Sequence, residues 1–199
     1  MTAHSLVYKV ANTPDEFRQI HELNYRTFVE EVGQHAPNLE RQLIDRFHNE
    51  NTYYICLAGA RLIGMVCTRD QRPFSLDLKI DNLNDLLPPH ENPVEIRLLA
   101  IDKDARTPQV FLGIMRLMAE ACAVADYDLA VVSALKQQDK LYKHLGFKAF
   151  GPVVGKPPVL FQPMYLDRDS FTVLADRTKL MRSATSERWA DSRRLHEDR

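Results

Sequence analysis

The stretch that most constrains the fold runs from residue 94 to 147 and alternates strands with helices. Val94 to Ile101 is a β-branched and aliphatic run that includes Glu95 and Arg97, and Leu129 to Leu135 is a second apolar run. Between them, Thr107 and Pro108 mark the start of a helix with apolar residues at helical spacing. Two strands joined by a helical crossover of this length are expected to be parallel, with a right-handed connection.

The start of that helix is a candidate anion site. Backbone N–H groups at a helix N-terminus, together with the helix dipole, favour a phosphate or pyrophosphate just beyond the strand end. Arg106 stands directly before the expected N-cap residue Thr107. The alternative interpretation is that Thr107 and Pro108 only begin a helix and that Arg106 is a solvated surface charge.

Two motifs resemble a known family. LLAIDKDARTPQVFLGIM at 98–115, followed by LYKHLGF at 141–147, resembles the acyl-donor half of the GNAT superfamily of N-acyltransferases. The resemblance implies an α/β (mixed α+β) fold, in which helices flank a central, mixed, twisted sheet with a splayed parallel strand pair. The pantetheine arm of an acyl thioester would lie between those strands, with a pyrophosphate on the next loop. The implied donor-binding residues are Leu99, Ala100, Ile101, Arg106, Thr107, Gln109 and Val110.

The loop departs from the family pattern in one respect. Family members usually have arginine or glutamine followed by glycines, whereas Thr107, Gln109 and Phe111 stand at those positions here. Without glycine the backbone approaches a pyrophosphate less freely. Acyl-CoA and acyl-ACP, the thioester of an acyl carrier protein, both remain as donor cosubstrates. The carrier-protein donor is favoured because it has no adenosine pyrophosphate, and no permanently bound cofactor is expected.

The N-terminal half narrows the resemblance to two branches, the acyl-homoserine-lactone synthases and the long-chain N-acyl amino acid synthases. It rests on YRTFVEEVG at 25–33, Asp45, Gly64, Arg69, RPF at 72–74, LLP at 86–88 and VEI at 94–96. QPMYLD at 162–167 fits the second branch. Lactone synthases place an arginine three positions after the strand glutamate, where this chain has Leu98. The amino acid or amine acylating relatives are therefore preferred. The substrate-binding candidates are Arg26, Phe28, Arg69, Phe74 and Arg97.

The chemistry implied by the resemblance is attack of an amine on a thioester, which is helped by a base for the amine and an acid for the departing thiolate. Glu95 is the candidate base, although Glu95 and Arg97 share one strand face and an ion pair between them is an equally good explanation. Tyr142 is the candidate acid, because a phenol of pKa roughly 10 suits donation to a thiolate. Its alternative role is packing. A backbone N–H near Leu99 to Ile101 would polarise the thioester carbonyl.

Bulk properties set the remaining expectations. A formal charge of −1 with interspersed signs argues against a nucleic-acid partner, and no apolar stretch is long enough for a membrane span. Three widely spaced cysteines without paired histidines indicate reduced thiols, a cytoplasmic location and no metal site. Residues 1–167 are expected to form one GNAT-like domain. Residues 168–199 are expected to be a charged, partly helical extension, either a homodimer contact or a solvated tail.

Three functions remain open at this point. The favoured one is an N-acyltransferase that moves a long acyl chain from an ACP or CoA thioester to the amine of an amino acid or similar small molecule. The second is a degenerate GNAT fold that binds an acyl ligand or partner without catalysis. The third is a short-chain, acetyl-CoA-dependent acetyltransferase. The presence of both Glu95 and Tyr142 favours the first. The long connection at residues 69–93, of a length that is usually a lid or binding loop, is harder to explain in a short-chain acetyltransferase.

Overall fold

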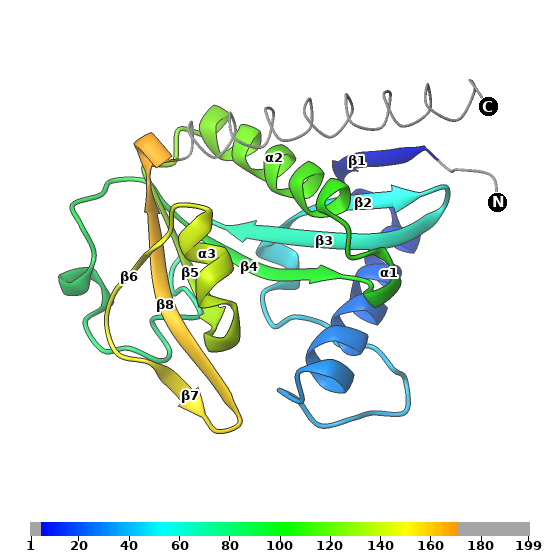
Figure 1. Ribbon diagram of the computed structural model, residues 1–199, viewed down its shortest axis with the longest axis horizontal. Helices are drawn as coiled ribbons and strands as arrows, with labels where there is room; N and C mark the ends of the chain where they lie inside the picture. The colour runs from blue at the N-terminus through cyan, green and yellow to red at the C-terminus, as the bar shows by residue number, and fades with distance from the viewer. Residues whose placement is uncertain (1–4, 171–199) are drawn as a thin grey trace, which may run out of the picture.

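The computed structural model describes residues 5–170, which form one eight-stranded mixed sheet with helices on both faces (Figure 1). The spatial order of the strands is β1-β2-β3-β4-β5-β8-β6, and β7 also pairs with β8. Within this described part, β4 and β5 are the parallel pair and the other pairs are antiparallel. The strands are β1 (Leu6–Val10), β2 (Thr52–Ala58), β3 (Arg61–Arg69), β4 (Pro93–Ile101), β5 (Leu129–Leu135), β6 (Lys148–Ala149), β7 (Val154–Lys156) and β8 (Val159–Asp167).

The helix starts follow from local sequence. Thr13 and Glu16 form a capping box at the start of the first helix, and Thr107 caps the helix that follows β4. Directly after the first helix the backbone widens into a π-helical turn, a feature that often marks functional sites. The helices are α1 (Pro14–Asn24), the π-helix η1 (Tyr25–Glu31), α2 (Pro108–Val124) and α3 (Asp139–His144). The 3₁₀ turns are η2 (His48–Glu50), η3 (Leu83–Leu86), η4 (Lys103–Ala105) and η5 (Lys136–Gln138).

Each face of the sheet has its own apolar core. On one face α2 packs Val110, Ile114 and Met118 against the central strands. On the opposite face α1 packs Ile20 and Leu23 against β2 and β3. The alternation of side chains along the strands therefore feeds two cores, and this arrangement fixes which face each strand residue presents.

The long connection at residues 69–93 is a packed segment of the structure, not a free lid. It lies on the face opposite α2 and buries a cluster of its own against Leu129 and Val131 of β5. The sequence predicts a lid or a binding loop here, and three residues of the connection, Ser75, Leu78 and Lys79, line the cleft described below. The buried side chains from the connection are Phe74, Leu76, Ile80, Leu83 and Leu87.

The parallel strands β4 and β5 separate partway along their length, as the sequence predicts. They are paired only from Pro93–Leu129 to Ile96–Val132. Beyond that point β4 contains a bulge, because Leu98 and Leu99 together stand opposite Val66 of β3. Leu98 has a left-handed backbone with φ of 56°. In Figure 1, β4 runs toward α1 while β8, which stays paired with β5, takes a different direction.

The predicted C-terminal extension at residues 168–199 lies outside the described residues except for its first three positions. Among residues 5–170, no helix is long and apolar enough to cross a bilayer. The same part of the chain contains no group of three or more side chains arranged to hold a metal ion.

Candidate active site

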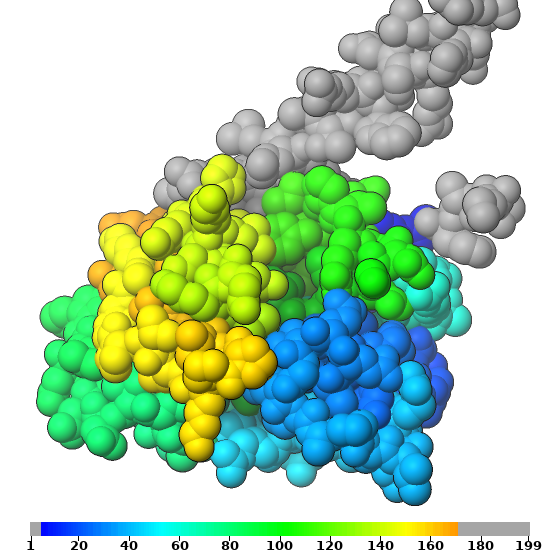
Figure 2. All heavy atoms as spheres, turned by 60° about the horizontal axis from the view of Figure 1, so that its bottom comes forward, coloured from blue at the N-terminus to red at the C-terminus, as the bar shows by residue number. Residues whose placement is uncertain are grey.

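A cleft of about 640 Å³ lies where β4 and β5 separate, a size typical of small-molecule sites. Its walls come from η1 and the segment after it, from the 69–93 connection, and from β4, β5, α3 and β8. In Figure 2, the blue segment that contains η1 lies beside the yellow and orange of β7 and β8. The lining residues are Asn24, Phe28, Gln34, His35, Leu43, Ile44, Asp45, Arg46, Ser75, Leu78, Lys79, Ile96, Arg97, Leu98, Leu99, Val132, Ser133, Leu135, Gln138, Tyr142 and Phe161.

On the β4 side of the cleft, Arg97 is held between two carboxylates. Its guanidinium donates to both oxygens of Asp45, at 2.7 and 2.9 Å, and its Nε lies 3.2 Å from Glu95 Oε2. The plane of the guanidinium also lies over the ring of Phe47. These hydrogen bonds hold the pKa of Asp45 below its usual value, although burial alone would raise it. The charge of Arg97 is therefore neutralised inside the protein.

Glu95 is fully buried and does not line the cleft. Its carboxylate accepts hydrogen bonds from the Ser75 backbone N–H at 3.0 Å and from the Ser75 hydroxyl at 2.5 Å, besides the contact with Arg97. Ser75 itself lines the cleft. In this geometry Glu95 orients Ser75 and Arg97, and the ion pair considered from the sequence is present.

On the opposite side of the cleft, the cation is Lys79, which contacts a hydroxyl and an aromatic ring. Lys79, from the 69–93 connection, places its ammonium 3.1 Å from Ser133 Oγ on β5 and 4.8 Å from the ring centroid of Phe161. Among the described residues no carboxylate forms an ion pair with Lys79. The surrounding protein lowers the pKa of Lys79 by desolvation, with Glu95 opposing and Arg97 adding to the shift.

Tyr142, on α3, is the lining residue that the sequence predicts as the acid. It is 5% exposed, lines the cleft and meets Phe147 edge to face at 5.4 Å between ring centroids. Burial raises the pKa of Tyr142 to about 12, so the phenol keeps its proton at all physiological pH values. The ring of Tyr142 therefore packs in the core and also lines the cleft, and its role as the acid stays a prediction.

The predicted donor loop between β4 and α2 is already occupied by internal contacts. Arg106 donates to the Ile101 carbonyl at 3.1 Å and pairs with Glu31 of η1. The Thr107 hydroxyl accepts from the Val110 N–H at 3.4 Å, and the Gln109 carbonyl accepts from Tyr8. A pyrophosphate at this loop would have to displace Glu31 and compete with the Thr107 cap.

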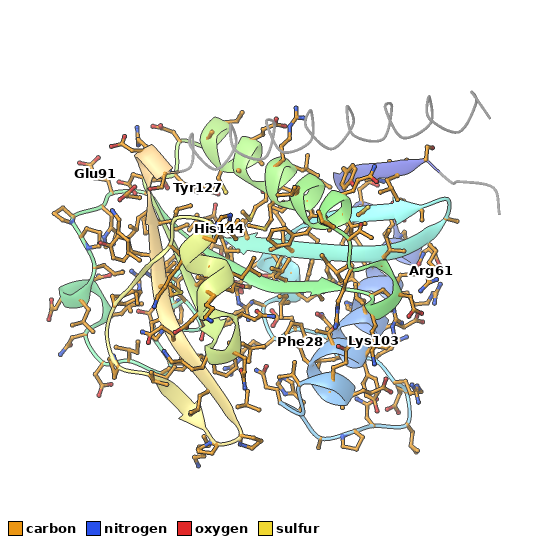
Figure 3. The ribbon with its side chains drawn as sticks, viewed as in Figure 1. Phe28, Arg61, Glu91, Lys103, Tyr127 and His144 are labelled. Carbon is orange, nitrogen blue, oxygen red and sulfur yellow. The ribbon has the colours of Figure 1, made fainter. Side chains whose placement is uncertain are left out.

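The substrate-binding residues predicted from the sequence separate into two groups. Phe28 and Arg97 line the cleft, and Figure 3 shows Phe28 near the space between η1 and α3. Arg26, Arg69 and Phe74 do not line it. Arg26 points toward Asp102 at 3.4 Å, and the other two are almost fully buried.

The two buried candidates have structural partners. Arg69 pairs with Glu50 at 2.5 Å, donates to the Pro73 carbonyl and stacks on the ring of Phe47. Phe74 is fully buried in the cluster that joins the 69–93 connection to β5. Both therefore hold the cleft walls in place.

Of the predicted donor-strand residues, Leu99 lines the cleft, whereas Ala100 is buried in the α1-side core. The bulge at Leu98 turns the β4 backbone away from regular pairing with β3. Bulges next to active sites commonly leave a backbone group free to bind a ligand. This is the part of the chain in which the sequence predicts the N–H that polarises the thioester carbonyl.

Sequence reasoning did not identify Lys79, Ser133 or Ser75 as site residues. The only signal for Lys79 and Ser75 is their position in an unusually long connection directly before the central strand. Ser133 interrupts the apolar run Leu129 to Leu135, and a lone polar residue in a buried strand is the one available hint.

Together, the splayed parallel pair, the bulged strand and the cleft between them define a GNAT-type acyltransferase. The sequence profile of the N-acyl amino acid synthase FeeM matches residues 19–168, which is most of the chain. The chain belongs to the FeeM N-acyl amino acid synthase family, and it is an acyltransferase. No curated protein sequence matches it significantly.

Solved structures agree with this fold. The CoA-dependent acyl-homoserine lactone synthase BjaI, solved with SAM and isopentyl-CoA, has a TM-score of 0.74 at 17% identity, over 88% of this chain and 90% of that one. FeeM from uncultured soil microbes has a TM-score of 0.66 at 16% identity, over 82% and 92%. ElaA from Escherichia coli has a TM-score of 0.61 at 15% identity, over 82% and 100%.

Proposed function

We propose that this N-acyltransferase moves a long acyl chain from a carrier-protein thioester to the amine of an amino acid. The observation that carries the proposal is the cleft of about 640 Å³ at the strand splay, which is larger than an acetyl group needs and has apolar side chains at about half of its lining positions. Each methylene buried there contributes about 0.8 kcal/mol, so a longer acyl chain would bind more tightly against the apolar part of the lining.

The carrier-protein donor is favoured by the state of the donor loop. Arg106, the one cation that directly precedes α2, is paired with Glu31, and the N–H of Val110 is capped by Thr107. An adenosine pyrophosphate needs free N–H groups and an available cation. A carrier protein presents its thioester on a phosphopantetheine arm, so it needs neither free N–H groups nor an available cation at this loop.

In the proposed reaction the acceptor nitrogen attacks the thioester carbonyl. A C–N bond forms and the C–S bond breaks. The acceptor loses its ammonium proton to solvent before attack and a second proton from nitrogen after it, while the departing thiolate gains one. A backbone N–H in the bulge of β4 would stabilise the developing oxyanion.

Tyr142 is proposed to assist the departing sulfur by donating a hydrogen bond. Burial raises the pKa of Tyr142 to about 12, so the phenol keeps its proton and can donate a hydrogen bond. A hydrogen bond to the developing negative charge on sulfur stabilises the transition state.

Glu95 is proposed as a positioning residue. Its buried carboxylate holds Ser75 and Arg97 at the cleft wall, and it has no direct access to an amine in the cleft. The proton from the acceptor therefore leaves through water in the cleft.

The experiment that tests the function is product analysis by mass spectrometry. The full chain is incubated with a pool of amino acids and, in parallel, with long-chain acyl-ACP, long-chain acyl-CoA or acetyl-CoA. We expect N-acyl amino acids from long-chain acyl-ACP and much less from the CoA donors. Products from acetyl-CoA alone would support the short-chain acetyltransferase. Acyl-ligand binding without product from any donor would support the non-catalytic alternative.

A further inference from the structure

We propose that Lys79 and Ser133 bind the carboxylate of the acceptor, so that the enzyme selects α-amino acids over simple amines. This inference rests on the proposed function and assigns the acceptor side of that site. It starts from the contrast between the two strongly basic side chains that flank the strand splay, Arg97 and Lys79.

The position of Ser133 fixes the geometry. Ile96 and Val132 are the last residues that pair β4 with β5, so Arg97 and Ser133 are the first residues beyond the parallel pairing. Residues in register on neighbouring strands point to the same face. Glu95 and Val131 are in register, and two positions further on Arg97 and Ser133 lie across the opening from each other on the face opposite α2.

Arg97 is not available to a substrate anion. Asp45 accepts two of its hydrogen bonds, and Glu95 lies 3.2 Å from its Nε. A third carboxylate near this group would meet two existing negative charges. The repulsion makes this wall of the cleft unfavourable for an acceptor carboxylate.

Lys79, unlike Arg97, is available to bind a carboxylate. Its ammonium reaches the cleft, is directed by Ser133 Oγ at 3.1 Å, and forms no ion pair with a carboxylate among residues 5–170. The ring of Phe161 supports the ammonium from another side at 4.8 Å. A carboxylate placed here would accept from both Lys79 and Ser133 and would neutralise an otherwise unpaired charge.

The spacing suits an α-amino acid. Its nitrogen and carboxylate are separated by a single carbon, so a carboxylate anchored at the first position beyond the splay keeps the amine beside the thioester carbonyl. Arg46 also lines the cleft, but its guanidinium lies over the ring of Phe47. Arg46 therefore provides a control cation in the same cleft.

The test compares three acceptors that differ only in the carboxylate: L-phenylalanine, its methyl ester and phenethylamine. kcat/KM is measured with long-chain acyl-ACP for the full-length wild type, Lys79→Met, Arg46→Met and the exposed surface control Lys143→Met. We expect Lys79→Met to lower kcat/KM for L-phenylalanine by roughly 10- to 100-fold, mainly through KM, because a hydrogen-bonded charge is lost. The values for the ester and the amine should change little.

Two further variants test the assignment of Lys79 and Ser133. Lys79→Arg should recover part of the activity toward L-phenylalanine, and Ser133→Ala should cause a smaller loss with the same carboxylate dependence. A wild type that uses all three acceptors equally would overturn the proposal. So would an equal loss for all three in Lys79→Met, a loss in kcat alone, or a carboxylate-dependent loss that appears in Arg46→Met instead.

A binding measurement separates this inference from the proposed function. Titration calorimetry compares the N-acyl product of L-phenylalanine with the N-acyl product of phenethylamine, on wild type and on Lys79→Met. If no acceptor is turned over, tighter binding of the carboxylate-bearing product that disappears in Lys79→Met would sustain the anchor while the catalytic function fails. Equal binding of the two products by wild type would overturn the anchor.

Discussion

The cations on the two sides of the cleft differ in whether a carboxylate pairs with them. On the β4 side, Arg97 is paired with Asp45 and Glu95, and Arg106 beyond the strand end is paired with Glu31. On the β5 side, Lys79 meets Ser133 and an aromatic ring, and no carboxylate among the described residues. A charge that the fold already neutralises holds structure in place, whereas a charge left unpaired in a cleft is available to a ligand.

The largest expected effect comes from breaking the paired side. Arg97→Met leaves Asp45 and Glu95 buried without their cation, and removing one partner of a buried ion pair costs about 3–5 kcal/mol. Urea unfolding should show this loss of stability. Lys79→Met, the same kind of change on the unpaired side, should shift stability by less than about 0.5 kcal/mol.

Similar stability of these two variants would contradict the contrast between the sides. A strongly destabilised Lys79→Met would indicate that Lys79 is a structural cation. The comparison needs no knowledge of the substrate, so it is independent of the functional proposal.

The next effect concerns the proposed role of Tyr142 in catalysis. Tyr142→Phe should lower kcat by roughly 10- to 100-fold, the value of a hydrogen bond to a charged atom, with unchanged binding of the acyl donor. Single-turnover kinetics and donor titration measure the two quantities. Tyr165→Phe, a tyrosine outside the cleft lining, serves as the matched control. Unchanged kcat would remove Tyr142 from the mechanism.

The smallest effect concerns the donor loop. Glu31→Gln removes the carboxylate that pairs with Arg106 and so frees a cation at the start of α2. We expect KM for acyl-CoA to fall by roughly 3- to 10-fold, in line with an exposed ion pair, while KM for acyl-ACP stays the same. An equal change for both donors would show that this loop does not distinguish them.

The elements that were predicted from the sequence are those with local causes. The capping box at Thr13, the cap at Thr107 and the apolar runs of β4 and β5 depend on neighbouring residues, and all are present. The splay of β4 from β5 was predicted only through the family resemblance. The bulge at Leu98 could not be predicted from the local sequence, because a leucine and not a glycine has the left-handed backbone there.

The candidate site was predicted less well, for a physical reason. Arg69 and Phe74 looked like substrate residues, but their charge and their ring are satisfied by Glu50 and by a core cluster. Lys79 and Ser75 lie in a connection whose apolar residues follow no regular period, so its fold depends on β5 and cannot be derived locally. Arg97 and Arg69 find their carboxylate partners on distant segments, so their pairing depends on tertiary structure.

The central claim is that an acyl chain occupies the cleft at the strand splay during transfer. The most direct measurement is the rate of N-acyl amino acid formation from thioester donors of graded chain length, in wild type and in Leu135→Trp, which places an indole in the cleft wall. The account predicts that the rate rises with chain length in wild type, by up to about fourfold per buried methylene, and that Leu135→Trp shifts the optimum to shorter chains. A thermal unfolding experiment checks that Leu135→Trp is folded. If it is, the same chain-length profile in both proteins would contradict the account.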